Sequence, residues 1–528
     1  MNNSKAIYIL YAFIGLYIIT AVIVLVQSSQ GVDWDPATCI KMTDNAYKGI
    51  PFNAYAHPKP GNLNEDEFEF VTWWSPGQFA VPLLIQKIVG IKVNIAIRIL
   101  TALCLLIAGL GIFNLFRLFL KNKDDKVENW PSTVALAFLL FTLLQPFFWK
   151  NLFVYNGGGI LMLAYCPWFM YWVIKINRIT LYSLLLLLLA GFVGFFLKSS
   201  FTSIFAAALF YLFLTKSINA SVPIKQQNVK KITVNALCLG AVLLVYILTI
   251  KIAYLNQNTG ISQSSTGIRL QPRVLLYPVI APVIGLFSLN FLNKTIYWII
   301  ASFFVIPIYY LLFKNDRLSL TYRYVLISFV ITTVSFYALL YFINVDVSYE
   351  LRHYIIISIL LTPAFFISLW KLPFGRYLVY GIVCIYTTIN IYQFTTAIIA
   401  NPKYQKTNLY SGFPTNYPAD LIEKVHTLDN LKGHKKDIFY FRSSELTIAL
   451  EVRNNRILFE DNFVNFHFNN KARYDSVLYF GRNSGELYLI YPLQNFRQDS
   501  ISYLTRFEKY KSFEKIYQTK GYAIFKAH

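Results

Sequence analysis

The sequence predicts a polytopic α-helical membrane protein with a small α/β domain at its C-terminal end. Of the 528 residues, 56% are hydrophobic and only 14% are charged, whereas soluble domains carry about 25% charged residues. Apolar stretches of about 20 residues, the length that crosses a bilayer, recur up to about residue 400. Beyond that point, short β-rich runs alternate with polar segments.

The apolar stretches predict eleven crossings. They are residues 6–27, 93–116, 132–149, 157–174, 179–197, 200–215, 232–254, 295–313, 322–343, 353–370 and 376–398. The first is too long for a signal-peptide core and has no cleavage site after it, so we expect a retained helix. Two further stretches, 76–91 and 274–291, are interrupted by proline and glycine and predict re-entrant or interfacial helices.

Short basic loops set the expected topology. They lie at 117–126, 175–178, 216–231, 314–317 and 371–376. If both interrupted stretches stay on the outer side, all five loops share one face, which the positive-inside rule makes cytoplasmic. We therefore expect a multi-pass protein of the cytoplasmic (inner) membrane, with a cytoplasmic N-terminus. The net charge of +22 is then explained by the basic loops that set the topology and by attraction to anionic lipid or to an anionic substrate. It does not indicate binding of nucleic acid.

Two domains are expected. Residues 1–400 form the transmembrane domain, with a long first external loop at 28–92, and residues 401–528 form an extracytoplasmic α/β domain. Within the second domain, strands are predicted at 437–441, 456–460, 476–480 and 486–491, and helices at 418–429 and 494–511. It contains no recognisable catalytic motif, so we expect a lid or docking role.

The first external loop holds the candidate catalytic acids, Asp33 and Asp35. Two carboxylates one residue apart can serve as a general base and its partner, or can hold a divalent metal. A solvated acidic loop is the alternative. Asp35 precedes Pro36, a residue favoured at the first position of a helix, so Asp35 also fits a helix cap. The cap role would lower its basicity and leave Asp33 as the freer acid.

Five cationic or imidazole side chains are candidates for binding a phosphate, and all are expected on the outer side. They are Lys198, Arg269, Arg273, Arg352 and His353. Arginine suits the geometry of phosphate, and lysine acts as a point charge. The alternatives are a Lys198 that extends to the membrane surface and an Arg352 that is occupied by Glu350.

Two tryptophans, Trp73 and Trp74, precede Pro76 and Gly77 in the same external loop. Tryptophan pairs anchor chains at the membrane interface. They could also shape a groove for a lipid tail, and the residues favour neither role.

These motifs together resemble the GT-C superfamily of integral-membrane glycosyltransferases, and in particular its polyprenol-phosphate-mannose-dependent branch. Asp35 is followed by Ala37, Gly49, Pro51 and Phe52, and later by the segment WWSPGQ. The segment FFLKSS is similar to the Lys-Pro segment of that branch, with Ser199 in place of proline, and YELRHYIII is similar to its late Arg-Tyr motif. The resemblance implies an inverting sugar transfer, metal-independent or weakly metal-dependent, with the loop acid as the base.

We therefore expect a glycosyltransferase that uses a polyprenyl-phosphate sugar donor at the outer face of the membrane. Its acceptor would be a lipid, a glycan or a protein. The alternative is a transporter or flippase of lipid-linked glycans. Transporters place charged residues near the centres of broken helices. Here the charged residues gather at the outer ends of the spans, which favours the enzyme.

Overall fold

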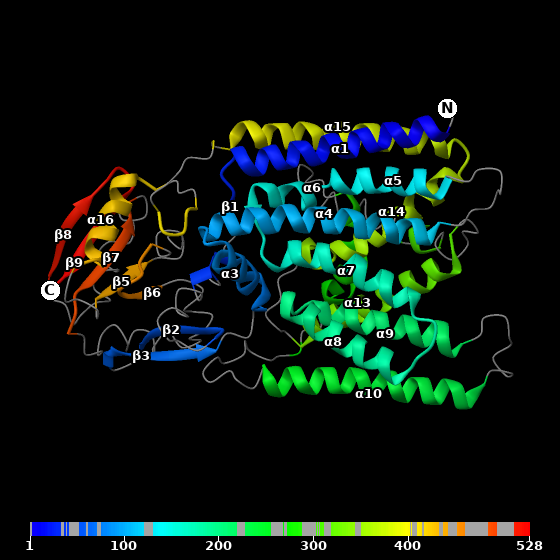
Figure 1. Cartoon of the computed structure of the whole chain (residues 1–528), viewed down its shortest axis with the longest axis horizontal. Coiled ribbons are helices and arrows are strands. Elements are labelled where there is room, and N and C mark those ends of the chain that lie inside the picture. Colours follow the sequence, from blue (N-terminus) through cyan, green and yellow to red (C-terminus); the bar gives the residue numbers. More distant parts are fainter. Residues whose placement is uncertain are drawn as a thin grey trace. The chain divides into compact units, whose positions relative to one another are not determined.

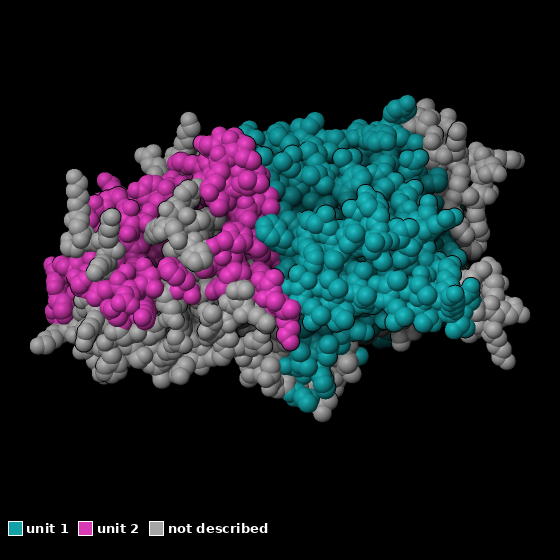
Figure 2. Space-filling model, turned by 60° about the horizontal axis from the view of Figure 1, so that its bottom comes forward, with its two compact units in different colours: residues 1–30, 97–250, 266–404 teal, residues 31–96, 251–265, 405–528 magenta. Residues whose placement is uncertain are grey.

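The computed structural model describes most of the chain. The described residues are 3–32, 36–37, 40–41, 52–59, 62–70, 75–120, 130–218, 228–254, 268, 272–287, 303, 305, 307–310, 318–343, 350–401, 403, 409–413, 417–431, 437–441, 451–459, 484–493 and 512–528. The chain divides into two compact units, coloured teal and magenta in Figure 2. Unit 1 comprises residues 1–30, 97–250 and 266–404, and unit 2 comprises residues 31–96, 251–265 and 405–528. The assignment of residues 1–400 and 401–528 to separate domains stays a prediction.

Unit 1 is a helical bundle (Figure 1). Its elements are α1 (Asn3–Gln27), α5 (Trp130–Leu143), α6 (Pro146–Trp149), η1 (Lys150–Leu152), β4 (Val154–Tyr155), α7 (Gly158–Lys175), α8 (Leu181–Leu197), α9 (Phe201–Ser217), α11 (Pro272–Phe287), α13 (Leu320–Phe342), η4 (Leu351–His353), α14 (Ile355–Trp370) and α15 (Gly375–Ala400), with most of α4 (Val93–Phe119) and α10 (Val229–Ala253). Helix α9 packs against α13, α11 packs against α13 and α14, and α1 packs against α5.

Helices occupy the predicted crossings, apart from 295–313, which lies mostly outside the described residues. Among the described residues, five helices are long and apolar enough to cross a membrane, or six if α5 and α6 are one bent span. Shorter apolar helices accompany them, and α11 is one of these. The count of eleven crossings and their orientation stay predictions.

The prediction of a single helix over 132–149 is wrong. The chain bends by 62° between α5 and α6. Gln145 is extended, with φ −70° and ψ 143°, and Pro146 opens α6. Proline disfavours the helical conformation for the residue before it and has no N–H to continue the hydrogen-bond ladder. The buried Gln145 side chain accepts a hydrogen bond from the Tyr386 hydroxyl at the break.

Unit 2 is built around a five-stranded mixed sheet in the order β6-β5-β7-β9-β8 (Figure 1). The strands are β5 (Ile438–Phe441), β6 (Arg456–Phe459), β7 (Leu487–Pro492), β8 (Phe513–Gln518) and β9 (Tyr522–Ala527). Strand β5 is parallel to β6 and β7, and β9 is antiparallel to β7 and β8. Every residue of β5 and β7 is buried, as expected of central strands. Helix α16 (Ala419–Asp429) adds Leu421, Ile422 and Val425 to the core of this sheet.

Unit 2 also contains strands that the sequence did not predict, namely β1 (Gly31–Val32) and the antiparallel hairpin of β2 (Ala54–Lys59) and β3 (Asn62–Phe70). The 13-residue helix α3 (Gly77–Val89) occupies the stretch 76–91, where a re-entrant or interfacial helix was expected. The hairpin of β8 and β9 was also missed. The strands predicted at 437–441, 456–460 and 486–491 and the helix at 418–429 are present. The strand at 476–480 and the helix at 494–511 lie outside the described residues.

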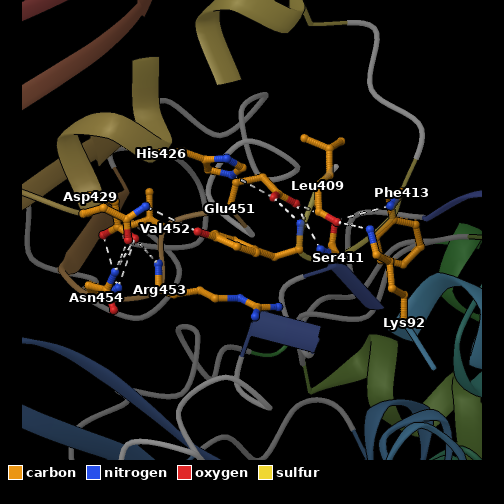
Figure 3. A network of polar contacts seen from close by, with 12 residues as sticks. Lys92, Leu409, Ser411, Phe413, His426, Asp429, Glu451, Val452, Arg453 and Asn454 are labelled. Atoms are coloured by element: carbon orange, nitrogen blue, oxygen red, sulfur yellow. Dashed lines mark hydrogen bonds and ion pairs between the residues drawn. The ribbon is translucent and has the colours of Figure 1, made fainter. Parts of the chain in front are cut away.

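Two buried carboxylates join α16 to the neighbouring loops of unit 2 (Figure 3). Glu451 accepts hydrogen bonds from the backbone N–H of Tyr410 at 2.7 Å, from the Ser411 hydroxyl at 2.6 Å and from His426 Nε2 at 3.1 Å. Asp429, at the end of α16, accepts from the backbone N–H groups of residues 453, 454 and 455. These bonds satisfy buried backbone donors that would otherwise destabilise the fold.

Candidate functional site

A small polar cavity in unit 1 brings together three of the predicted phosphate-binding residues, Lys198, Arg352 and His353. Its volume is about 30 Å³, whereas a water needs roughly 10–15 Å³ on this measure. The other polar side chains that line it are Asn156, Ser200, Ser203 and Thr333. The cavity therefore suits one compact polar group and is too small for a sugar.

Lys198 lies at the junction of α8 and α9. It follows the last residue of α8 in an extended conformation, with φ −161° and ψ 127°, and its N–H bonds to the Gly194 carbonyl at 2.9 Å. After two turn residues, α9 begins at Phe201. The 17-residue helix α9 thus starts beside the cavity, where Ser200 and Ser203 line the wall. The N-terminal end of a helix carries partial positive charge and adds to the attraction for an anion.

A run of three glycines lets the chain approach Lys198 closely. Gly157 has φ +57°, a backbone conformation that residues with a side chain rarely adopt. A Cβ at Gly158 would lie 3.0 Å from the Leu197 carbonyl oxygen and 3.2 Å from Lys198 Cβ. The segment from Asn156 to Gly159 therefore forms one wall of the cavity and holds the base of the lysine side chain. This wall was not among the predicted site residues, although the motif Asn-Gly-Gly-Gly indicates a close approach of the backbone.

Arg352 and His353 reach the same cavity from η4, the short turn before α14. Arg352 forms an ion pair with Glu350, and the two side chains are 32% and 44% exposed. The pair expected as an alternative is therefore present, but it is partly solvated and Arg352 still lines the cavity. A partly exposed pair of this kind contributes little to stability.

His353 differs from the two cations because both of its ring nitrogens are buried without a hydrogen-bond partner among the described residues. Its ring lies 5.4 Å from the ring of Tyr337 on α13. Thr333, also on α13, has a buried hydroxyl that likewise lacks a partner among the described residues. Buried polar atoms are normally satisfied. Unpartnered donors that line a cavity therefore indicate a site for water or for a polar ligand.

The electrostatics of the cavity favour negative charge. Burial, followed by the charges of Lys198 and Arg352, lowers the pKa of His353 from 6.5 to about 3. Burial is the larger cause, and the two cations add to it because the potential that they create is positive. Such a potential stabilises a phosphate group, which offers only acceptor oxygens.

The structure describes little of the other predicted site residues. Arg273 lies in the first turn of α11, where the structure describes its backbone only. The two acids Asp33 and Asp35, the tryptophans Trp73 and Trp74, and Arg269 lie outside the described residues. Their roles stay predictions. No cluster of three potential metal ligands occurs among the residues that the structure describes.

A second cavity in unit 1 is apolar. It has a volume of about 320 Å³ and lies among α1, α4 and α5, where Ala21, Gly109 and Leu139 are among its lining residues. It shares no lining residue with the cationic cavity. It carries no charged side chain and cannot bind the phosphate.

Comparison with known proteins identifies the fold. No family model and no curated protein matches the chain. Among solved structures, ArnT from Cupriavidus metallidurans bound to undecaprenyl phosphate is similar, with a TM-score of 0.54, 9% sequence identity and 98% of each chain covered. The same protein in the apo state gives a TM-score of 0.51, with the same identity and coverage. The likeness spans the small C-terminal sheet as well as the helices, and it confirms the predicted GT-C-like fold class.

Proposed function

We propose that the protein is a glycosyltransferase that moves a sugar from a polyprenyl-phosphate donor to a lipid, glycan or protein acceptor at the outer face of the membrane. The observation that carries this proposal is the cationic cavity. Lys198 and the adjacent pair Arg352 and His353 come from two distant parts of the chain and line one small cavity. A site of this charge and size suits the phosphate of a lipid-linked donor better than any sugar.

The likeness to ArnT supports the same function. ArnT is a GT-C glycosyltransferase, and one of its structures holds undecaprenyl phosphate. At 9% identity the likeness concerns the fold. A fold alone does not fix an activity, and the cationic cavity is therefore the main support for the proposed function. The ligand of ArnT has the phosphate chemistry that the cavity suits.

In the proposed reaction, a carboxylate removes the proton from an acceptor hydroxyl, and the resulting oxygen attacks the anomeric carbon of the donor sugar. The bond from that carbon to the phosphate oxygen breaks, and its electron pair leaves with the polyprenyl phosphate. We assign Asp35 as the base and keep Asp33 as the alternative. The phosphate gains one negative charge in this step. Fixed cations stabilise such a charge most as it develops, so Lys198 and Arg352 would accelerate the reaction itself.

The resemblance of the first loop to the polyprenol-phosphate-mannose branch makes mannose the first sugar to test. It also supports a transfer that does not depend strongly on a metal. Should a divalent metal take part, Asp33 and Asp35 are the residues that we propose to hold it. Pentose donors form the second class to test, because ArnT transfers aminoarabinose.

The alternative, a flippase of lipid-linked glycans, would use the bent pair α5 and α6. Broken helices form substrate sites near the middle of the membrane in transporters. The polar group at this break is Gln145, which is bonded to Tyr386 and to no charged residue among those described. The cations lie instead in the cavity beside the ends of α8 and η4. This separation favours the enzyme.

The phosphate assignment can be tested with cation variants. Lys198→Met and Arg352→Met should each raise the KM for a polyprenyl-phosphate sugar and lower kcat/KM roughly 10- to 100-fold, the usual cost of losing a charged hydrogen bond. Lys175→Met is the matched control, because Lys175 is an exposed lysine at the end of α7. Unchanged kinetics in both cavity variants would contradict the assignment.

A further inference from the structure

His353 has an unusual position for a buried histidine. Its two ring nitrogens are buried, and no described residue offers either of them a hydrogen bond. A neutral imidazole has one N–H donor and one acceptor nitrogen, whereas the protonated ring has two donors. A phosphate offers acceptors only, so a phosphate in this cavity is best complemented by the protonated ring.

Without an anion the ring stays neutral. Burial, Lys198 and Arg352 all oppose its protonation and lower its pKa to about 3. Several charged or titratable groups lie near it among the described residues. Lys198 follows α8, Arg352 precedes the histidine in η4 and pairs with Glu350, and α13 contributes Tyr337. Tyr337 packs against Tyr341 on the same helix and against Tyr354 before α14, and Tyr354 packs against Tyr277 of α11. The described walls from α9 and α14 contribute serine and apolar side chains only.

We propose that His353 takes up a proton from solvent when a phosphate anion occupies the cavity, and that it then acts as the third cation of the site. This inference rests on the proposed function. An anion in the cavity offsets the positive charges of Lys198 and Arg352 and accepts a hydrogen bond from the ring, and both effects raise the pKa of the histidine. The uptake balances as one proton added to a ring nitrogen and one removed from the buffer.

The consequence is selectivity for charge. The donor is a phosphodiester with one negative charge, and the product is a phosphomonoester with two. A doubly charged group stabilises the protonated ring more strongly than a singly charged group does. His353 would therefore be protonated most fully as the leaving group forms, and it would favour the polyprenyl phosphate product over the intact donor.

Calorimetric titration with farnesyl phosphate tests this proposal on the whole protein in detergent. Heats of binding would be measured at pH 7.5 in HEPES and in Tris, because the difference between buffers gives the number of protons exchanged. At this pH the monoester, with a second pKa of about 6, is already almost fully ionised. The wild type should take up close to one proton per ligand bound. His353→Gln should bind more weakly and take up much less, and His528→Gln, at an exposed histidine, should match the wild type.

The outcomes separate the two proposals. Binding of farnesyl phosphate to the wild type with no proton uptake would overturn the role of His353, whether or not the variants fold. Equal uptake in His353→Gln would overturn it as well. Absence of binding to the wild type would overturn the phosphate site itself, and this inference with it. Inorganic phosphate is the second probe, and we expect it to bind at least 10-fold more weakly. Equal affinity would assign the cavity to free phosphate and overturn the lipid assignment.

Discussion

Lys198, at the end of α8, and His353, in the turn before α14, line the same cavity, and the charge of the lysine helps to lower the pKa of the histidine. The two residues are far apart in the sequence, so only the packing of the bundle brings them together. Helix α13 contributes to this, because it packs against α9 and supplies Thr333 and Tyr337 beside the histidine. The cavity is thus a property of the fold.

The first prediction concerns topology. In a variant without native cysteines, a single cysteine placed within 430–436 should react with a membrane-impermeant reagent added outside intact cells. A cysteine placed within 220–228 should react only after the membrane is opened, because the basic loops are expected in the cytoplasm. The measurement is labelling before and after permeabilisation. The reverse pattern would place the cationic cavity at the wrong face for an externally acting enzyme.

The second prediction concerns the glycine wall. Gly158→Val should weaken donor binding several-fold, because the new side chain would meet the Leu197 carbonyl and displace Lys198. Gly240→Val on α10 is the control, since a Cβ there has no neighbour within 4 Å. KM for the donor is the quantity to compare, with protein yield as the check on folding. An unaltered KM for Gly158→Val would mean that the wall does not position the lysine.

The third prediction concerns the pH dependence of unit 2. Burial raises the pKa of Glu451, but hydrogen bonds from His426, Ser411 and the backbone outweigh it, so that the net pKa lies below its usual value of 4.5. A lowered carboxyl pKa stabilises the folded state above pH 4.5, and this stabilisation is lost as the pH falls through the lowered pKa. Glu451→Gln should therefore destabilise unit 2 by about 1–3 kcal/mol at neutral pH, with a smaller effect near pH 3.

Hydrogen exchange of the segment 409–413 reports on this network, because Glu451 holds the N–H groups of Tyr410 and Ser411. Glu423→Gln is the control, since Glu423 is exposed on α16. If both variants exchange at the wild-type rate at neutral pH, the network does not stabilise this part of the protein.

Much of the helical architecture could be predicted from the sequence, because a span needs a long apolar run and little else. The break at Gln145 was missed, since hydropathy continues through it and only Pro146 marks it. The hairpin of β8 and β9 was missed although Lys520 and Gly521 form a turn signal between two β-rich runs. The hairpin of β2 and β3 was missed because its acidic strand has a mostly polar composition.

Only part of the candidate site could be predicted from the sequence. Lys198, Arg352 and His353 could be chosen because charged or titratable residues near apolar helices are energetically costly unless they are exposed, paired or functional. The walls made by Asn156 and Thr333 could not be chosen in this way, because such residues occur in many helices and turns. Their contribution depends on which helices pack together, and hydropathy does not contain that information.

The fourth prediction concerns the base. Asp35→Asn keeps the shape of the side chain and can still cap a helix. If Asp35 is the base, this variant should fold normally and lose transfer activity by a factor of about 100 or more. Asp33→Asn should lose less. A fully active Asp35→Asn beside an inactive Asp33→Asn would transfer the role to the neighbouring acid.

The proposed function requires that the protein breaks the bond between a sugar and a polyprenyl phosphate. The most direct measurement is the release of polyprenyl phosphate from a radiolabelled polyprenyl-phosphate mannose by the purified protein in detergent, with membrane lipid extract as the source of acceptor. Detergent micelles have no two sides, so a flippase can give no signal in this assay. We predict release of polyprenyl phosphate with transfer of the label to an acceptor, and a decrease of both by roughly 10- to 100-fold in Lys198→Met at low donor concentration. If mannose and pentose donors both remain intact while the protein moves them across the membrane of reconstituted vesicles, the protein is a flippase and the proposed glycosyltransferase activity is wrong.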